Sequence, residues 1–316
     1  MSCANEEMQP NILPKTSQEK EILNIGILAP GGAVFNYKHI TKTKEFLQNE
    51  GFDVTLGETL KSNFGYFSAN DETRAKEINR FFEDKNIDII ICARGGWGCN
   101  RIIPYLDLDI IRQNPKPLVG FSDITTLLNY IHFKTGMITY HGNMAYSSWG
   151  NYSYQSFDNT IVKQTTNKIV NHPSFQRKNI SKPTVISAKG KLIGGNLTVL
   201  TSMIGTEYEP VWKNNILCLE DTHEEPYKID RMLLQLRDNG VFNQLAGIII
   251  GQFNKCEAEN PEQSFTLDEV FTQYFSELPI PVISNCSFGH VVHKFSIPIG
   301  QMAEINVENQ SISLIY

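Results

Sequence analysis

The chain has 316 residues, of which 41% are hydrophobic and 20% are charged, with a formal net charge of −6. This composition is typical of a globular protein with about two domains of ~150 residues each. The negative charge and the lack of a long basic run argue against nucleic acid and anionic membranes as partners. No stretch reaches the ~18 apolar residues that a membrane span needs.

Six cysteines are scattered along the chain, and none forms a C-x-x-C pair. Free cysteines in apolar runs behave as small hydrophobes, so this pattern indicates a reduced, cytoplasmic protein. Residues 1–21 are polar, without the apolar core of a signal peptide, and we expect a flexible lead-in there. If a leader preceded Met1, Cys3 would be the candidate site of a lipid anchor.

The first half of the chain alternates between apolar runs and amphipathic segments. Strands are predicted over 24–30, 52–57, 87–93, 116–121 and 137–143, and helices over 38–50, 71–84 and 123–134. Strands that alternate with helices form a parallel α/β sheet, in which ligands bind beyond the carboxyl ends of the strands. We therefore predict an N-terminal domain over 22–165.

Residues 144–183 are polar and aromatic, and we interpret them as a crossover that leads into a linker over 166–186. The rest predicts a C-terminal α/β domain over 187–316. Its expected elements are a strand with a turn at Gly194-Gly195, a helix from Asn196, a strand over 215–221, a helix over 226–238, a strand over 246–253, a helix over 266–276, a strand over 281–290 and a hairpin that turns at Glu308-Asn309.

Ser122, in the stretch VGFSDITTLL, lies at the corner between a predicted strand and helix. A serine there holds its hydroxyl at the edge of a sheet, as in a nucleophile elbow, although Ile124 replaces the second glycine of G-x-S-x-G. The alternative is that Ser122 only caps the helix, with Asp123 complementing the helix dipole. Arg94-Gly95-Gly96 and His141-Gly142 also follow strand ends, and this convergence favours the nucleophile.

A serine nucleophile needs a base, and a carboxylate that orients the base. Of the seven histidines, His290 follows an apolar strand in a Gly-His turn, where the alternative is a histidine bonded to backbone. Glu220 ends an apolar strand, so the sheet would fix its position. The neighbouring Glu224 and Glu225 instead suit solvation and the N-terminus of the next helix.

The loop Arg94-Gly95-Gly96-Trp97-Gly98 also follows a strand. Its glycines would allow backbone N–H groups to approach a ligand closely, as an oxyanion hole requires. The loop matches neither G-x-G-x-x-G nor a P-loop, which disfavours a nucleotide site. No pair of histidines at helical spacing indicates zinc, so we expect neither a metal nor a cofactor.

Seven ordered motifs resemble the LD-carboxypeptidase family, serine peptidases that trim bacterial muropeptides. They run from about Ile25 to the C-terminus and read IGILAPGG, ARGGWGCNRIIPYLD, VGFSDITTLL, HGNM, IGGNL, LCLEDTHEEPYKIDRMLLQL and FGHVVHKFSIPIG. The resemblance implies an N-terminal Rossmann-like domain, a smaller C-terminal α/β domain, an active site between them and, commonly, a homodimer. Asn143 and Trp97 depart from the proline and tyrosine that are usual in the family, and Trp97 would affect the pocket.

The same resemblance implies the roles of individual residues. It assigns the nucleophile to Ser122, the carboxylate to Glu220, the base to His290, and the oxyanion donors to Gly95 or Gly96 and Asp123. Arg94, at a strand end, is a candidate donor to the terminal carboxylate of the substrate, and a structural ion pair with Asp123 is the alternative.

We therefore expect a cytoplasmic serine-type LD-carboxypeptidase that releases the terminal D-alanine of murein tetrapeptides in peptidoglycan recycling. Its expected partner is a muropeptide substrate, with no nucleic acid and no membrane. Two other functions stay open: a peptidase that gives immunity to microcin C-type peptidyl nucleotides, and a non-catalytic muropeptide-binding protein. The presence of Ser122, Glu220 and His290 argues against the second of these.

Overall fold

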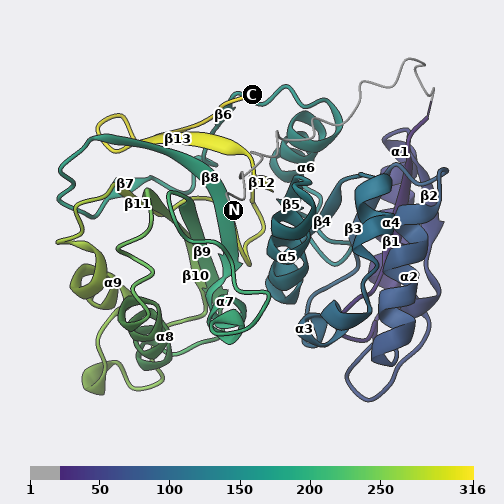
Figure 1. The fold of residues 1–316 in the computed structure, drawn as a ribbon, viewed down its shortest axis with the longest axis horizontal. Helices are drawn as coiled ribbons and strands as arrows, with labels where there is room; N and C mark the ends of the chain where they lie inside the picture. The colour runs from purple at the N-terminus through teal and green to yellow at the C-terminus, as the bar shows by residue number, and fades with distance from the viewer. Residues whose placement is uncertain (1–21) are drawn as a thin grey trace, which may run out of the picture.

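The structure is a computed structural model that describes residues 22–316. The lead-in predicted over 1–21, with Cys3, lies outside the described residues. Two β-sheets with flanking helices form a mixed α/β fold, which confirms the predicted fold class (Figure 1). Within residues 22–316, none of the helices combines the length and apolar character needed to cross a membrane.

The first sheet has six strands and is built mainly from the first half of the chain. Their spatial order is β12 (Ile297–Ile299), β5 (Thr139–His141), β4 (Leu118–Gly120), β3 (Ile89–Cys92), β1 (Asn24–Leu28) and β2 (Asp53–Leu56). All neighbours pair in parallel except β12, which is antiparallel to β5. The β3 strand is buried along its whole length, as its continuous apolar sequence predicts for a sheet covered on both faces.

Helices cover both faces of this sheet, as the sequence predicts. One face packs against α2 (Asp71–Glu83), α3 (Cys99–Ile102), α4 (Leu108–Gln113) and α5 (Thr125–Thr135), and the other against α1 (Tyr37–Asn49) and α6 (Asn151–Phe157), which continues as the π-helical turn η4 (Asp158–Val162). Short 3₁₀ turns occur at η1 (Glu58–Leu60), η2 (Ile103–Tyr105) and η5 (Pro261–Gln263). The sequence did not predict α6, because its polar and aromatic residues give no clear helical stripe.

The second sheet has eight strands. Their order is β6 (Lys168–Ile169), β14 (Ser311–Leu314), β13 (Met302–Asn306), β8 (Ser187–Asn196), β9 (Ile216–Thr222), β10 (Gly247–Asn254), β11 (Val282–Ser284) and β7 (Lys178–Asn179). The four strands from β8 to β11 are parallel. The pairing of β13 with β14 confirms the predicted C-terminal hairpin, and the two short strands β6 and β7 lie within the predicted linker.

One face of the second sheet is covered by α7 (Leu197–Met203), α8 (Pro226–Asp238) and α9 (Leu267–Phe275). The predicted apolar stripe of α8 is buried there. The predicted turn at Gly194-Gly195 is wrong, because both glycines lie inside β8 and pair with β9. The helix that was expected from Asn196 begins at Leu197, and Asn196 caps it by accepting a hydrogen bond from the Val199 amide.

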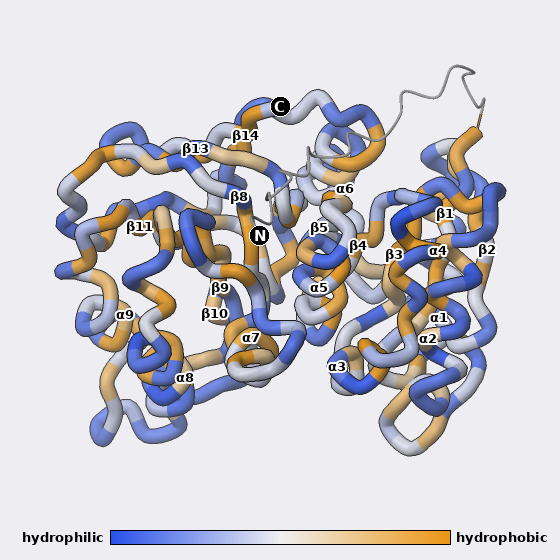
Figure 2. Tube along the Cα trace, in the orientation of Figure 1, coloured by the Kyte–Doolittle hydropathy of each residue, from blue (hydrophilic) through white to orange (hydrophobic). Residues whose placement is uncertain are grey.

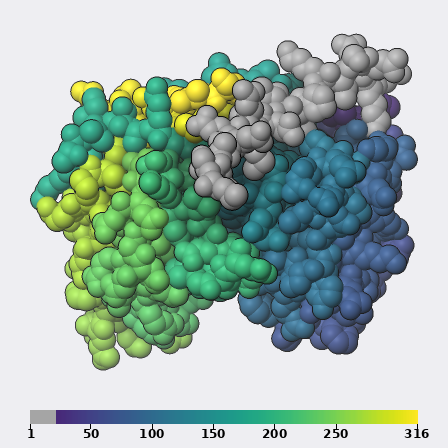
Figure 3. Space-filling view, in the orientation of Figure 1, coloured from purple at the N-terminus to yellow at the C-terminus, as the bar shows by residue number. Residues whose placement is uncertain are grey.

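A single buried cluster joins the two sheets. It includes apolar residues of α2 and α5 together with residues on β8, β9 and β12. Figure 1 shows α5 in the middle of the molecule, where it contacts both β8 and α7. Figure 2 shows hydrophobic stretches on helices such as α7 as well as on strands, and the surface in Figure 3 divides into a blue lobe and a green-to-yellow lobe. The domain limits 22–165 and 187–316 stay a prediction.

The position of β12 predicts how an isolated first half behaves. A fragment that ends at residue 165 lacks β12 and exposes the edge of β5, which is an unpaired template for aggregation. We expect the fragment to elute as aggregates in size-exclusion chromatography under conditions where the full chain is monodisperse. A monodisperse fragment with a cooperative thermal transition would contradict this account of the first sheet.

Candidate active site

Ser122 begins the 3₁₀ turn η3 (Ser122–Ile124) between β4 and α5. Its φ of +64° lies in the left-handed region, where residues other than glycine are uncommon and strained. No side-chain capping hydrogen bond is found at the start of η3 or of α5. The Ser122 side chain therefore does not act as a helix cap, and the strained turn presents its hydroxyl at the carboxyl end of the first sheet.

Glu220 and His290 form a hydrogen-bonded pair. Glu220 lies in β9 and is fully buried, and its Oε2 accepts a hydrogen bond of 2.7 Å from Nδ1 of His290, whose side chain is 21% exposed. Gly289 has a φ of +102°, and a Cβ there would lie 2.7 Å from Glu220 Oε2. Only glycine therefore allows the loop to bring His290 this close to the carboxylate.

The pair changes the pKa values of both its members. Burial alone would raise the pKa of Glu220, but the charge of His290 and the contacts of the His141 and His290 rings outweigh burial and hold this pKa below its usual range. Burial would lower the pKa of His290, but the charge and the hydrogen bond of Glu220 raise it overall. The carboxylate thus strengthens the imidazole as a base.

The glycine loop after β3 packs directly on Ser122. A Cβ at Gly95 would lie 2.8 Å from Ser122 Oγ and 3.1 Å from the backbone nitrogen of Asp123. The buried Asp123 carboxylate accepts a hydrogen bond of 3.0 Å from the Cys99 amide, which ties the loop to the η3 turn. The structure therefore brings together Ser122, Asp123 and the loop that contains Gly95 and Gly96.

Arg94 lies at the start of this loop. It donates a hydrogen bond of 2.9 Å from Nη1 to the carbonyl of Ala33, and its guanidinium carbon lies 5.9 Å from the centre of the Tyr146 ring. Among the described residues, no ion pair joins Arg94 to Asp123, whose carboxylate accepts from Cys99 instead. The ion pair that we considered as an alternative role for Arg94 is therefore not formed.

Phe121 connects the serine turn to the loop of His290. The rings of Phe121 and His290 meet edge to face with centres 4.9 Å apart, and Nζ of Lys294 lies 4.9 Å from the centre of the Phe121 ring. Lys294 is buried, and burial lowers its pKa to about 8 despite the nearby charge of Glu220. Sequence reasoning missed Lys294, and its only signal was a lysine inside the motif FGHVVHKF.

The other acidic candidates have structural roles. Glu224 forms an ion pair with Lys228, one helical turn further along, with 3.5 Å between the charged atoms. Glu225 is the N-cap residue of α8. This confirms that the two residues belong to the start of the helix, whereas Glu220 points into the buried region between the sheets.

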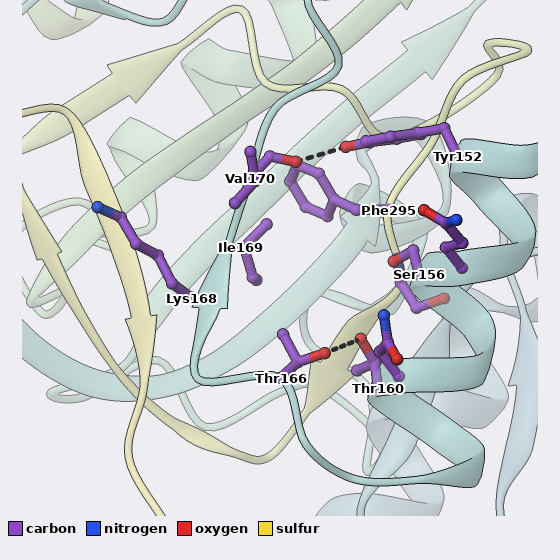
Figure 4. Close-up of a pocket in the computed structure, with 11 residues that line it drawn as sticks. Tyr152, Ser156, Thr160, Thr166, Lys168, Ile169, Val170 and Phe295 are labelled. Carbon is purple, nitrogen blue, oxygen red and sulfur yellow. Dashed lines mark hydrogen bonds between the residues drawn. The ribbon is translucent and has the colours of Figure 1, made fainter.

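A cavity of about 190 Å³ lies apart from these residues (Figure 4). It is lined by residues of α6, η4 and the segment 166–170, and by Phe295 and Ser296. A hydrogen bond between the hydroxyls of Thr160 and Thr166 and one from Tyr152 to the Val170 carbonyl satisfy polar groups on its wall. None of the seven candidate site residues lines this cavity, so it is not the candidate active site.

Comparisons with known proteins assign the chain to one family. The LD-carboxypeptidase N-terminal domain matches residues 25–142, and the LD-carboxypeptidase C-terminal domain matches residues 189–305. Both halves of the chain are therefore those of a two-domain peptidase. The chain belongs to the LD-carboxypeptidase family.

Individual relatives cover almost the whole chain. A probable murein peptide carboxypeptidase of Bacillus subtilis is 32% identical over 95% of this chain and 93% of its own length. A solved structure of MccF in complex with glutamyl sulfamoyl guanosine has a TM-score of 0.85 at 25% identity and covers 94% of this chain and 96% of its own. A muramoyltetrapeptide carboxypeptidase from Oxalobacter formigenes has a TM-score of 0.79 at 28% identity, with 92% and 97% covered.

The Glu220–His290 pair predicts a shift that is measurable without substrate. Glu220→Gln removes the negative charge that raises the pKa of His290, so this pKa should fall. NMR titration of the His290 ring measures the change directly. Glu224→Gln is the matched control, because Glu224 pairs with Lys228 instead, and it should leave the titration unchanged. An equal shift in both variants would contradict the assignment of Glu220 as the partner.

Proposed function

We propose that this chain is a serine-type LD-carboxypeptidase that hydrolyses the L,D-peptide bond before the terminal D-alanine of murein tetrapeptides. One observation carries the proposal: a fully buried carboxylate, Glu220, holds His290 at 2.7 Å, and the His290 ring packs against the residue that precedes a strained serine. The names of the Bacillus and Oxalobacter relatives support murein peptides as the substrate class.

In this mechanism Ser122 Oγ attacks the carbonyl carbon of the scissile bond while Nε2 of His290 takes its proton. Backbone N–H groups of Gly95 or Gly96 and of Asp123 stabilise the oxyanion. The imidazolium then protonates the amine of the leaving D-alanine as the C–N bond breaks. Water, deprotonated by His290, attacks the acyl-enzyme and releases the shortened peptide and Ser122.

Glu220 takes part in these reaction steps only through its hydrogen bond to His290. Its hydrogen bond fixes the tautomer that carries the proton on Nδ1 and leaves Nε2 as the acceptor. Its charge stabilises the imidazolium that forms during both steps. Because Glu220 is fully buried, solvent does not weaken this interaction.

Arg94 is our candidate for recognition of the terminal carboxylate of the substrate. A guanidinium has five N–H donors and binds a carboxylate through two parallel hydrogen bonds. Within the part of the chain that the structure describes, Arg94 donates a hydrogen bond only from Nη1, to the Ala33 carbonyl. The absence of an ion pair with Asp123 supports this role.

The similarity to MccF favours a second candidate, an immunity peptidase that acts on peptidyl nucleotides. Its solved structure has the higher TM-score of the two structures compared above, 0.85 against 0.79. Arg94 and the stretch PYKIDRML argue for the murein reaction, because the immunity branch tends to lack both. A third hypothesis is a non-catalytic muropeptide-binding protein. The presence of Ser122, Glu220 and His290 argues against it, because binding alone does not require all three residues.

The proposal also includes where and in what form the protein acts. The domains would span 22–165 and 187–316, which the matched ranges 25–142 and 189–305 support. The five cysteines of the described chain are all free and buried, which supports a reduced, cytoplasmic compartment. There we propose a homodimer that serves peptidoglycan recycling.

The substrate assignment predicts a specific product. We expect the purified protein to remove one D-alanine from L-Ala-D-Glu-(diamino acid)-D-Ala. The pentapeptide ending in D-Ala-D-Ala should be a poor substrate, because its last bond joins two D-residues and its extra residue moves the carboxylate out of register. Mass spectrometry of both digests measures this. Equal cleavage of both stems, or cleavage of an aminoacyl nucleotide analogue alone, would favour the immunity function.

Ser122→Ala tests the nucleophile. The variant should lose a factor of about 10⁴ or more in kcat, since the other groups cannot replace the attacking oxygen. Its thermal unfolding should stay close to that of the parent, because the Ser122 side chain makes no capping hydrogen bond. Activity within about tenfold of the parent would exclude Ser122 as the nucleophile.

A further inference from the structure

The Glu220 carboxylate has a second oxygen that the mechanism above does not use. Oε2 bonds to His290, whereas Oε1 is buried and has no hydrogen-bond partner among the described residues. A buried acceptor without a donor costs about 1–3 kcal/mol, and more when it is charged. Nε2 of His141 lies 3.6 Å from Oε1, just beyond hydrogen-bond distance.

The His141 ring lies where it could donate a hydrogen bond to this oxygen. It is the last residue of β5 and is fully buried, and neither of its ring nitrogens has a hydrogen-bond partner in the described chain. Phe121 and Phe288 contact its ring, with centres 5.6 and 5.7 Å away, and the Phe288 contact is edge to face. These apolar neighbours offer no hydrogen bond, so Glu220 is the polar group to which the imidazole is directed.

We propose that His141 is a positioning residue whose Nε2–H is the second donor to the Glu220 carboxylate. With one donor on each oxygen, the carboxylate cannot rotate about its terminal bond, and Oε2 stays on Nδ1 of His290. Such partners of a catalytic group preserve its geometry without touching the substrate. The inference rests on the proposed function, because it assigns a role within the same reaction.

Two other charged groups lie near this contact. The Asp221 carboxylate accepts hydrogen bonds from the Asn196 side chain and from Thr198, and burial followed by the charge of Glu220 raises its pKa to about 6. Nζ of Lys294 lies over the Phe121 ring. Apart from the Glu220 carboxylate, the groups that contact the His141 ring in the described part of the chain are the Phe121 and Phe288 rings, which carry no charge.

The direction of the pH effect follows from these neighbours. Loss of the N–H donor leaves more negative charge on the carboxylate that faces His290. That charge stabilises the imidazolium, so His290 holds its proton to higher pH. Because the base must be neutral to accept the Ser122 proton, the acid limb of kcat/KM should move to higher pH.

The test compares His141→Gln with His141→Asn in the full chain. The glutamine amide nitrogen takes a place near Nε2 and retains a donor to Glu220, whereas the asparagine amide corresponds to Nδ1 and does not reach it. We expect His141→Gln to keep kcat within about threefold of the parent. His141→Asn should lose roughly tenfold to a hundredfold in kcat with KM little changed, and its acid limb should move to higher pH.

His132→Gln is the control for a merely structural histidine. His132 is also buried, but its Nδ1 lies 2.9 Å from the Met137 carbonyl. This variant should lower the melting temperature without moving the pH profile. Equal losses in both His141 variants with an unshifted profile, or no loss in His141→Asn, would overturn the inference.

An NMR measurement separates this inference from the proposed function. In the substrate-free parent, ¹⁵N shifts should show the proton of His141 on Nε2 at neutral pH, and an unprotonated Nε2 would overturn the inference even if His141→Asn does not fold. A parent protein that cleaves no stem peptide would refute the proposed function, while the ¹⁵N result would still decide whether His141 donates to Glu220.

Discussion

The structure depends on the burial of one carboxylate. Moving an ionised carboxyl group out of water costs several kcal/mol unless charges and hydrogen bonds replace the lost hydration. Glu220 is fully buried, and His290 supplies the partner at 2.7 Å. The partner comes from a loop that leaves the second sheet and crosses to the first, so the carboxylate is stable only when both sheets are in place.

The two sheets contribute different parts of this arrangement. The first provides Ser122 at the end of β4 and His141 at the end of β5, and the second provides Glu220 within β9. The glycine at 289 and the glycine loop at 95 allow backbone to approach side chains more closely than a Cβ would permit. The candidate site therefore depends on how the two sheets pack against each other, and core residues of α5 and β8 take part in this packing.

Much of this could be predicted from sequence because it depends on local patterns. Parallel strands give continuous apolar runs, and residues at their carboxyl ends share one edge of the sheet, which is why Ser122, Glu220 and Gly95 could be singled out. The turn at Gly194-Gly195 was mispredicted because glycine pairs usually interrupt a strand, whereas here β9 holds them in the sheet. Three features could not be predicted, because they depend on contacts between residues far apart in sequence, which no local pattern encodes. They are the pairing of β12 with β5, the burial of Lys294 beside the Phe121 ring and the orientation of the His141 ring toward Glu220.

The return of β12 to the first sheet has a consequence during synthesis. This strand spans Ile297–Ile299, far beyond β5 in the sequence, so β5 has no partner on this edge while the intervening residues are being translated. The first sheet can form its parallel core early, but its last edge is closed only after the strands β8 to β11 of the second sheet have been translated. The first sheet is therefore completed late when the chain folds during synthesis, and the loop that carries His290, which directly precedes β12, emerges just before this step.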